Sequence, residues 1–363
     1  MNRLHHLKQT LPVNIADNDD YPELEFVILD YSSVDGLADW MKKDVGEFID
    51  NGKVIYYRAN DPRTFTHSHT KNIAFRLCSG DIICNINADH YTGKGFANFV
   101  NKCFYENSKI VITTIDFFQT RLNYNVPNDV LGKFCVTRND FMNINGFDEN
   151  IVNYGYEDSD IVNRLEMSGL KRVLLENLTF LRYIEHGIEE RFSYKKILAN
   201  VHSVYLAYCS PYKSKVLYLY NSNLFQTGTL IDNFAKDSAD IIASHSKKSY
   251  RYNIEREEPI WDEGKWIEQP GSNSFKLSFS SGESLILDAQ NDESFSSSVK
   301  EYLKFYKMTD ENIIYQLTIF NYILDSSCKM ENNLENHIMK VNLKGFTSCS
   351  LSKNFDEATT ISI

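Results

Sequence analysis

The N-terminal part of the chain alternates short apolar runs with an amphipathic stretch. Residues 24–33 (LEFVILDYSS) and 52–60 (GKVIYYRAN) are nearly continuous apolar runs, which predict strands of a sheet that is covered on both faces. Between them, residues 34–49 carry apolar side chains at helical spacing, which predicts a helix. The order strand, helix, strand favours a parallel sheet.

The same alternation continues through the next hundred or so residues. Residues 66–81 predict a helix that ends at Gly80, and residues 82–89 (IICNINAD) predict a strand whose last residues turn polar. Residues 108–118 predict another strand, and residues 157–170 predict a short helix with an apolar stripe. We therefore expect an α/β fold in which a mostly parallel sheet is flanked by helices.

The last hundred or so residues show a different pattern. Residues 273–287 alternate apolar and polar positions around a Ser-Ser-Gly turn, which predicts a β-hairpin, and residues 337–346 alternate in a similar way. Residues 298–308 predict a helix, whereas residues 313–324 are compatible with either a buried helix or a strand. This mixture indicates a smaller α+β region without a chemical motif.

The middle of the chain separates these two parts. Residues 195–234 have a mostly helical pattern, after which the composition becomes charged and rich in serine. We therefore predict an α/β domain with a helical extension at 1–232, a linker at 233–258 and a smaller α+β region at 259–363.

Composition and charge restrict the class of partner. The chain has 363 residues, of which 42% are hydrophobic and 13% aromatic, and this is enough for a substantial core. Its formal net charge is −11. Because proteins that bind nucleic acids usually carry a basic surface, this charge argues against a nucleic-acid partner.

The cysteines and the hydrophobic stretches bear on location. The seven cysteines are scattered and form no Cys-x-x-Cys pair, which favours reduced thiols in a cytoplasm. No stretch reaches the roughly 18 consecutive apolar residues of a membrane span. We expect a cytoplasmic protein without a transmembrane segment, and the pattern leaves open a peripheral association with the inner membrane face.

Three clusters of acidic and amide side chains follow predicted strands or begin a predicted helix. Each cluster alone has a simple explanation, because Asp and Asn often make turns and cap helices. Together they suggest a ligand site, since open α/β sheets bind ligands beyond the carboxyl ends of their strands. The clusters are Asp30 and Asp35, Asn87 and Asp89, and Glu157, Asp158 and Asp160.

Four stretches of the chain resemble family 2 glycosyltransferases of the GT-A fold, in particular the galactosyltransferase-like branch. The stretches are VILDYSSVDGL, KNIAFRLCSGDIICNINAD, NGFDENIVNYGYEDSDIVNRLEMSGL and IEHGIEERF. The third is the most specific, since it resembles the NGFDE and GxEDxD signature of that branch. The resemblance covers about residues 1 to 200 and implies a Rossmann-like GT-A domain.

The resemblance implies a divalent cation held by Asp89 and His186, where Asp89 is the last residue of a DxD-like motif. A carboxylate with an imidazole suits Mn²⁺ better than Mg²⁺. The motif has Asn87 where the family usually has Asp, which predicts weaker metal binding. His67 and His69 are not expected to form a second metal pair, because side chains two positions apart on a helix point in different directions.

The resemblance also assigns residues to the two substrates. Asp158 would be the base that deprotonates the acceptor hydroxyl, and Glu157 would hold other hydroxyls of the acceptor. Direct attack by that hydroxyl would invert the anomeric carbon. The residues expected to contact the sugar-nucleotide donor are Asp30, Lys71, Asn72, Asn87 and Asp89, and those expected to contact the acceptor are Tyr154, Gly155, Tyr156 and Glu157.

The resulting hypothesis is an inverting glycosyltransferase. It would move a hexose or N-acetylhexosamine from a UDP-sugar to a saccharide or lipid-linked saccharide acceptor in bacterial surface-polysaccharide biosynthesis. The alternative is a non-catalytic protein of the same fold that binds nucleotide sugars or carbohydrates. A third hypothesis gives the C-terminal region a tethering role toward a partner or a membrane-bound acceptor.

The N-terminal sequence departs from the family pattern. Members of the family usually begin with a strand before the first helix, whereas this sequence begins with MNRLHHLKQTLPVNI, which predicts that helix directly. Either this sequence starts after that strand, or the GT-A sheet lacks its first strand. A missing central strand would leave backbone groups unpaired.

Overall fold

The computed structural model divides the chain into two units. The first comprises Met1–Glu185 and Tyr322–Ile363, and the second comprises His186–Asn321. The chain thus leaves the first unit, forms the second and returns, whereas the sequence predicted a boundary after residue 232. The structure describes residues 1–60, 65–115, 130–186, 198–210, 213–231, 262–271, 274–290, 293–297 and 302–363.

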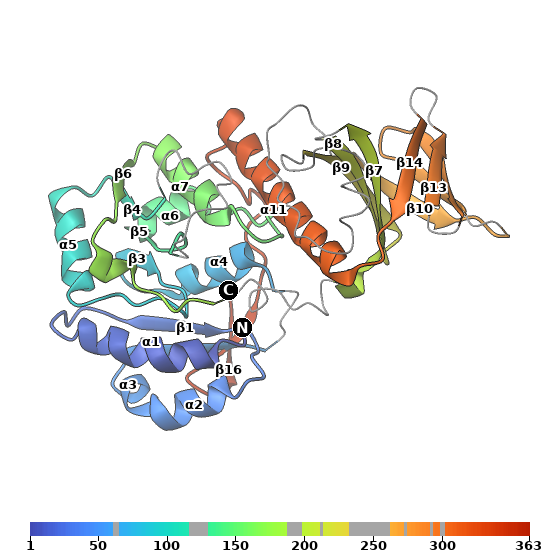
Figure 1. Cartoon of the computed structure of the whole chain (residues 1–363). Helices are drawn as coiled ribbons and strands as arrows, with labels where there is room; N and C mark the ends of the chain where they lie inside the picture. Colours follow the sequence, from blue (N-terminus) through green and yellow to red (C-terminus); the bar gives the residue numbers. More distant parts are fainter. Residues whose placement is uncertain are drawn as a thin grey trace. The chain divides into compact units, whose positions relative to one another are not determined.

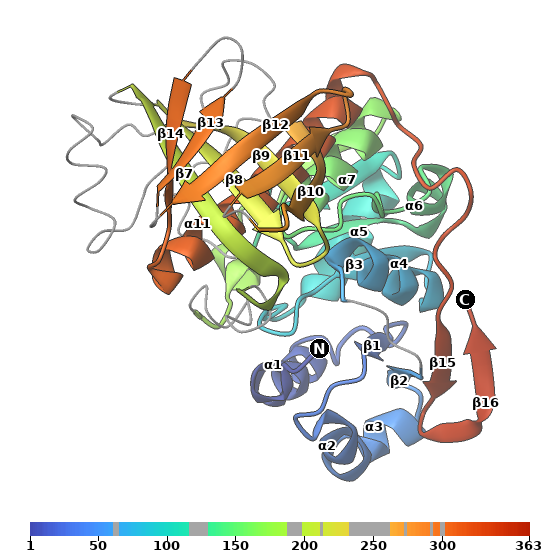
Figure 2. The same ribbon diagram turned by 90° about the vertical axis from the view of Figure 1, so that its right-hand side faces the viewer.

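The first sheet of the first unit joins the two ends of the chain (Figures 1 and 2). Its strand order is β1 (Phe26–Asp30), β2 (Val54–Ala59), β15 (Ser350–Lys353) and β16 (Asp356–Ser362). Strands β1 and β2 are parallel, as predicted, and β15 pairs antiparallel with β2. The C-terminal hairpin therefore belongs to the α/β unit and not to a separate C-terminal region.

The second sheet carries the predicted strand that ends near Asp89. Its order is β3 (Ile82–Asn85), β5 (Phe134–Thr137), β4 (Ile110–Thr113) and β6 (Lys171–Leu174). Strands β4 and β6 are parallel, and the other two pairs are antiparallel. The α/β class is confirmed, but the described sheets are mixed, because the parallel pairs are limited to β1 with β2 and β4 with β6.

Helices cover both faces of these sheets. Helices α1, α2 and α3 pack on β1 and β2, whereas α4, α6 and α7 pack on the second sheet. None of the described helices is both long and apolar enough to cross a membrane. The helices are α1 (Leu4–Asp17), α2 (Leu37–Asp44), α3 (Gly46–Asp50), α4 (His67–Leu77), α5 (Phe96–Glu106), α6 (Arg138–Asn143), α7 (Glu157–Met167), the 3-10 helix η2 (Leu178–Leu181) and α11 (Glu311–Glu335).

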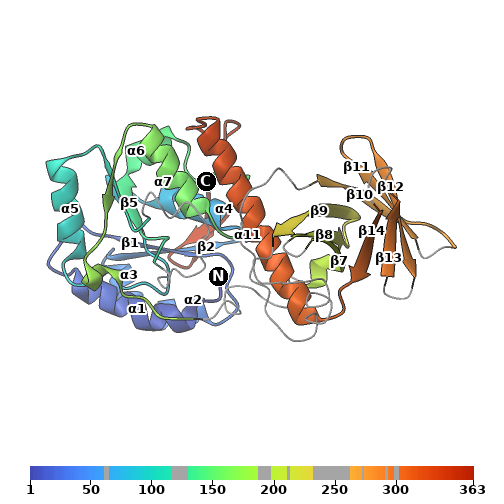
Figure 3. The same ribbon diagram turned by 45° about the horizontal axis from the view of Figure 1, so that its top comes forward.

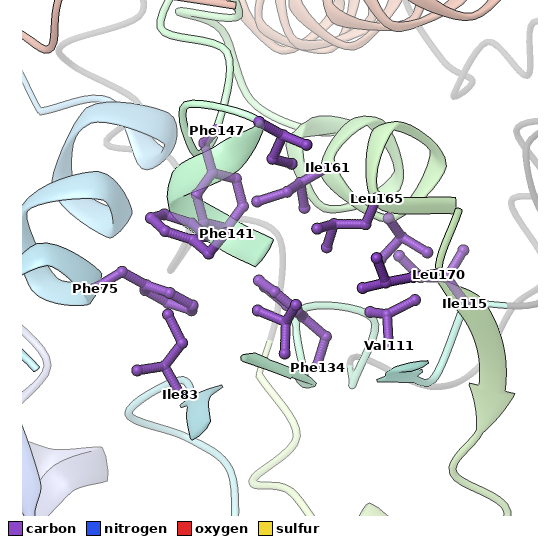
Figure 4. Packing of buried hydrophobic residues seen from close by; sticks show 13 residues of the cluster. Phe75, Ile83, Val111, Ile115, Phe134, Phe141, Phe147, Ile161, Leu165 and Leu170 are labelled. Carbon is purple, nitrogen blue, oxygen red and sulfur yellow. The ribbon is translucent and has the colours of Figure 1, made fainter. Parts of the chain in front are cut away.

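Phenylalanines dominate the core between the second sheet and helices α4, α6 and α7 (Figure 4). The ring centroid of Phe75 lies 5.4 Å from that of Phe134 and 4.8 Å from that of Phe141, and Phe147 meets Phe75 edge-on at 5.8 Å. Aromatic pairs attract each other at these separations. Helix α5 covers the other face of the sheet, because neighbouring residues of β4 alternate between the two cores.

The second unit contains an eight-stranded antiparallel sheet that closes on itself (Figure 2). Its interior holds apolar side chains such as Phe225, Trp266 and Leu287, all buried. The strands are β7 (Val201–Ser210), β8 (Lys213–Tyr220), β9 (Leu224–Ile231), β10 (Asp262–Glu268), β11 (Ser274–Phe279), β12 (Ser284–Gln290), β13 (Glu293–Ser297) and β14 (Tyr302–Lys307).

This sheet overturns several secondary-structure predictions and confirms one. The sequence predicts a mostly helical segment at 195–234, but its described part forms β7, β8 and β9, in which Leu217 and Leu219, two positions apart, join the apolar core of the closed sheet. The helix predicted at 298–308 is also wrong, because strand β14 occupies 302–307. The hairpin predicted at 273–287 is confirmed by the pairing of β11 with β12.

Two further predictions concern the C-terminal part of the chain. The ambiguous stretch 313–324 lies in helix α11. The strand predicted at 337–346 is wrong, because this part of the first unit consists of turns and loops. The predicted linker at 233–258 lies outside the described residues.

We predict that Phe134→Ala lowers the free energy of unfolding by about 3–5 kcal/mol, because it leaves a cavity among the other phenylalanines of the core. Urea unfolding monitored by circular dichroism would measure the loss. Tyr105→Ala is the control, since Tyr105 is 90% exposed and its removal should change the free energy by no more than about 0.5 kcal/mol. Equal losses for the two variants would contradict this view of the core.

Candidate active site

Helix α7, whose position Figure 3 shows, begins with two acidic residues, Glu157 and Asp158. The chain enters the helix through Gly155 and Tyr156, both with positive φ values of 95° and 63°. Glycine adopts this conformation easily, whereas a tyrosine in it is uncommon. The resulting sharp entry presents the side chains of Glu157 and Asp158 from the first turn of the helix, where the helix dipole favours negative charge.

Lys71 on helix α4 lies between these two carboxylates. Its Nζ is 3.0 Å from Oε1 of Glu157 and 2.6 Å from Oδ1 of Asp158. All three side chains are largely buried, with exposed fractions of 11%, 6% and 16%. One ammonium group therefore serves two carboxylates in a partly dehydrated environment, where charge interactions are stronger than in water.

This arrangement separates the pKa values of the two acids. Burial, together with the charge of Glu157, raises the pKa of Asp158 to about 6, although Lys71 opposes the shift. For Glu157, burial acts in the same direction, but the charge of Lys71 and its hydrogen bond to Glu157 outweigh burial and lower the pKa. Asp158 is thus the carboxylate better able to take up a proton near neutral pH.

Asn87, which follows strand β3, lies near Asp158, and Gly132 borders both side chains. A Cβ atom on Gly132 would lie 2.9 Å from Nδ2 of Asn87 and 3.0 Å from Oδ2 of Asp158, so both side chains border this glycine. Asn85 donates hydrogen bonds to Oδ1 of Asn87 and to the carbonyl of Gly132. The structure therefore brings Asn87 and Asp158 together, and it adds Asn85 and Gly132, which no sequence motif indicated.

Asp89 lies in the turn after β3, and its side chain is 13% exposed. Its carbonyl accepts a hydrogen bond from the amide of Ile184 at 2.8 Å, and His90 pairs with Tyr183. The segment that leads to His186 is thus fixed to the Asp89 turn, although His186 itself falls at the start of the second unit. The joint role of Asp89 and His186 as metal ligands stays a prediction.

The buried side chain of Lys133 holds the turn that carries Asp89. Its ammonium group donates hydrogen bonds to the carbonyls of Tyr91 and Phe180, and burial lowers its pKa to about 8.

Among the described residues, no group of three or more His, Cys, Asp or Glu side chains could hold a metal ion. The Asp89 carboxylate does fit a divalent cation as a single hard oxygen ligand.

Two predicted donor contacts have well-defined protein partners. Asp30 is fully buried and accepts hydrogen bonds from the amide of Ser33 and the hydroxyl of Tyr56. The amide group of Asn72 bonds the backbone of Phe147 in both directions, at 2.9 and 2.8 Å. Each side chain thus holds its own part of the first unit, and contact of either one with a donor stays a prediction.

An aromatic group borders the acid pair. The ring of Tyr154 meets the ring of His67 edge-on at 5.4 Å, and Nδ1 of His67 lies 3.9 Å from Oε1 of Glu157. Burial lowers the pKa of His67 to about 4, so the imidazole is neutral at neutral pH. His67 was considered in the sequence only as half of a metal pair, and its position beside Glu157 depends on the packing of α4 against α7.

Comparison with known proteins points to glycosyltransferases. Residues 112–195 match the family described as the N-terminal domain of galactosyltransferase, and this range contains Gly132, Glu157 and Asp158. No curated protein matches the sequence significantly. The family match confirms the resemblance seen in the sequence, and the α/β fold of the first unit is consistent with a GT-A-like fold.

Several solved structures are similar to parts of this chain. Residues 1–349 of TarS from S. aureus share 14% identity with a TM-score of 0.38, and the match covers 48% of this chain and 56% of the TarS chain. Drosophila beta1,4-galactosyltransferase 7 in complex with xylobiose shares 17% identity with a TM-score of 0.31, over 47% of this chain and 73% of that one. GalNAc-T7 with UDP, GalNAc and Mn²⁺ shares 11% identity with a TM-score of 0.39, over 86% and 78%.

We predict that Lys71→Met destabilises the protein more near pH 8 than near pH 5. Near pH 8 both acids are ionised and lose their shared cation, which should cost about 3–5 kcal/mol. Near pH 5 Asp158, whose pKa is raised to about 6, is largely protonated, so the loss should be smaller. Urea unfolding at both pH values measures the difference, with Lys42→Met on the exposed face of α2 as control. A loss that does not depend on pH would contradict the assigned ionisation.

Proposed function

We propose that the protein is an inverting glycosyltransferase that moves a hexose or N-acetylhexosamine from a UDP-sugar to a hydroxyl group of a saccharide. The observation that carries the proposal is the cluster of Lys71, Glu157 and Asp158, which places a carboxylate with a pKa of about 6 beside the end of strand β3. Two of these three residues lie within the range that matches the galactosyltransferase family.

The chemistry requires a base for the acceptor and a binding place for the donor. Asp158 takes the proton from the acceptor hydroxyl, whose oxygen forms a bond to the anomeric carbon while the bond from that carbon to the diphosphate breaks. Attack from the side opposite the leaving group inverts the anomeric carbon. Lys71 stays close to both carboxylates and stabilises Asp158 in its ionised form before the proton arrives.

The donor would bind along the ends of the strands. Asn87, which borders Asp158, can hydrogen-bond a hydroxyl group of the donor, and Asp30 lies at the end of strand β1 in the other sheet of this unit. Lys71 and Asn72 follow each other on α4, where Asn72 fixes the segment at Phe147. Contacts of these four residues with the donor are part of the proposal.

The acceptor would bind next to Glu157. Glu157 can accept hydrogen bonds from sugar hydroxyls, and Tyr154 with His67 provides an aromatic wall of the kind on which apolar sugar faces pack. Gly155 and Tyr156 shape the entry to α7 beside them. A saccharide or lipid-linked saccharide of a bacterial cell surface, made at the cytoplasmic side of the membrane, is the acceptor class that we propose.

A divalent cation belongs to this proposal. Asp89 and His186 would hold Mn²⁺ or Mg²⁺, and oxygens of the donor diphosphate would complete the coordination, as substrate phosphates often do for such ions. When bound, the cation offsets the negative charge of the departing diphosphate. The turn that carries Asp89 is held by Lys133, which keeps the carboxylate in place before the donor arrives.

We predict that Asp158→Asn lowers the rate of UDP release from a UDP-sugar about 10²- to 10⁴-fold, because the amide cannot accept the proton. Binding of the sugar nucleotide, measured by calorimetry, should persist. In the unchanged protein the rate should rise with pH through about 6, since Asp158 must be ionised to act as base.

Asp39→Asn is the control for this experiment, because Asp39 is exposed on α2 away from the acid pair. A screen of UDP-sugars with Mn²⁺ present and absent identifies the donor. If sugar nucleotides bind but Asp158→Asn leaves every measured function unchanged, the non-catalytic alternative is correct.

We predict that Asp89→Ala weakens Mn²⁺ binding in the presence of UDP. The affinity for Mn²⁺ should fall by at least about 10- to 100-fold. This is the loss found when a residue that only supports a metal ligand is removed, and Asp89 is proposed as a direct ligand. Titration followed by electron paramagnetic resonance of Mn²⁺ measures it without requiring turnover. Equal Mn²⁺ affinity in Asp89→Ala and Asp39→Ala would remove Asp89 from the proposed site.

A further inference from the structure

The last turns of α11 contact helix α7, which carries the acid pair, and the two helices lie side by side there (Figure 3). Asn333, near the end of α11, is buried and donates one hydrogen bond to Oδ2 of Asp148 at 2.9 Å and one to Oδ1 of Asp160 at 2.8 Å. Asp160 lies in the first turn of α7, two residues after Asp158. Asn333 thus links a segment about 170 residues away to the turn that presents the proposed base.

Asn333 provides hydrogen bonds to two buried carboxylates. Asp148 and Asp160 are both buried, and Arg164, also buried, pairs with Asp160 at 2.7 Å between Nε and Oδ2. Buried carboxylates need hydrogen-bond donors, because they have lost their contacts with water. The two N–H groups of Asn333 meet this need for both acids at once. Tyr156 occupies the N-cap position of α7, and Asp160 is held by Arg164 and Asn333.

A second asparagine of the same segment holds the loop before α7. Asn342 donates to the carbonyls of Asn145 and Phe147 at 2.8 and 2.7 Å, and it accepts from the amide of Glu149 at 3.1 Å. Phe147 is held from the other side by Asn72, the neighbour of Lys71. Phe147 is therefore the point at which the C-terminal segment meets the helix that carries the shared cation.

Glu149 extends this connection. It accepts hydrogen bonds from Asn72 and from the amide of Thr347, at 3.0 Å each. Burial would raise its pKa, but the nearby His69 and the hydrogen bonds from Thr347 and Asn72 outweigh burial and lower the pKa to about 2. Glu149 is therefore ionised at neutral pH, and its charge joins α4 to the C-terminal segment.

We propose that Asn333 and Asn342 are positioning residues for the acid pair, and that residues 322–349 support the active site by holding α7 and the loop before it in place. This inference rests on the proposed function. Asn333 fixes the first turn of α7, and Asn342 fixes the loop next to α4, so that Asp158 and Glu157 stay at hydrogen-bond distance from Lys71. A displacement of ~1 Å between such groups can reduce a rate by about 10²-fold.

The variants Asn333→Ala and Asn342→Ala test this inference by steady-state kinetics of UDP release. We expect kcat to fall about 10- to 100-fold, with the KM for the UDP-sugar changed by no more than about twofold, because the donor contacts lie on other elements. Asn336→Ala is the matched control, since Asn336 is exposed on the next turn after Asn333 and bonds only within its own segment. It should keep both parameters.

A loss of stability must be separated from a loss of position. Val100→Ala removes buried methyl groups from the apolar face of α5, away from the acid pair. It should lower Tm without lowering kcat at a temperature below the transition. If Asn333→Ala fails to fold, Asn342→Ala decides the question. Positioning is refuted if the folded asparagine variants keep kcat within about twofold of the unchanged protein, or if Val100→Ala loses kcat to the same extent at an equal Tm.

Hydrogen exchange provides a readout that does not depend on turnover. Amides of α7 from Asp160 onward should exchange at least about tenfold faster in Asn333→Ala than in Asn336→Ala, because the first turn loses its anchor. If the unchanged protein releases no UDP from any donor, the proposed function fails, and this exchange difference still tests the positioning. Equal exchange in the two variants would refute the anchor even in an active enzyme.

Discussion

The shared ion pair of Lys71 with Glu157 and Asp158 is the interaction on which the rest of the site depends. One buried ammonium group contacts two carboxylates from a different helix, at 3.0 and 2.6 Å. Such a group of charges is stable only if its geometry is held, because an uncompensated buried charge is costly. Burial of this group, together with the charge of Glu157, raises the pKa of Asp158 to about 6 against the opposing charge of Lys71.

Buried polar contacts add to the apolar packing of α4 and α7 and fix the segments around them. Asn72 binds the backbone at Phe147, Arg164 pairs with Asp160, and Asn333 satisfies two buried acids. Each of these side chains is directional, so it fixes an orientation that the phenylalanine core alone would leave less defined. The core provides the free energy of folding, and the polar contacts specify where the acid pair lies within it.

The path of the chain gives the C-terminal segment a part in this arrangement. The described strands of the second unit occupy the chain between Glu185 and Tyr322, and the segment that follows pairs with β2 and binds the loop before α7. A tethering role for the whole C-terminal region therefore fits the structure poorly, because Tyr322–Ile363 belongs to the first unit. The closed antiparallel sheet of the second unit is the part to which no function is assigned.

The sequence by itself determined the α/β class, the early order of strand, helix and strand, and the identity of the acid pair, because apolar periodicity and the motif around Asp158 are local features. It misjudged β7 to β9 and β14, whose helical or strand character is decided by closure of a sheet between distant segments. It also could not reveal Gly132, His67 or Asn333, since each acts through a contact with a residue far along the chain. Only the tertiary structure decided these contacts, because burial and the satisfaction of buried charge are properties of the packed molecule.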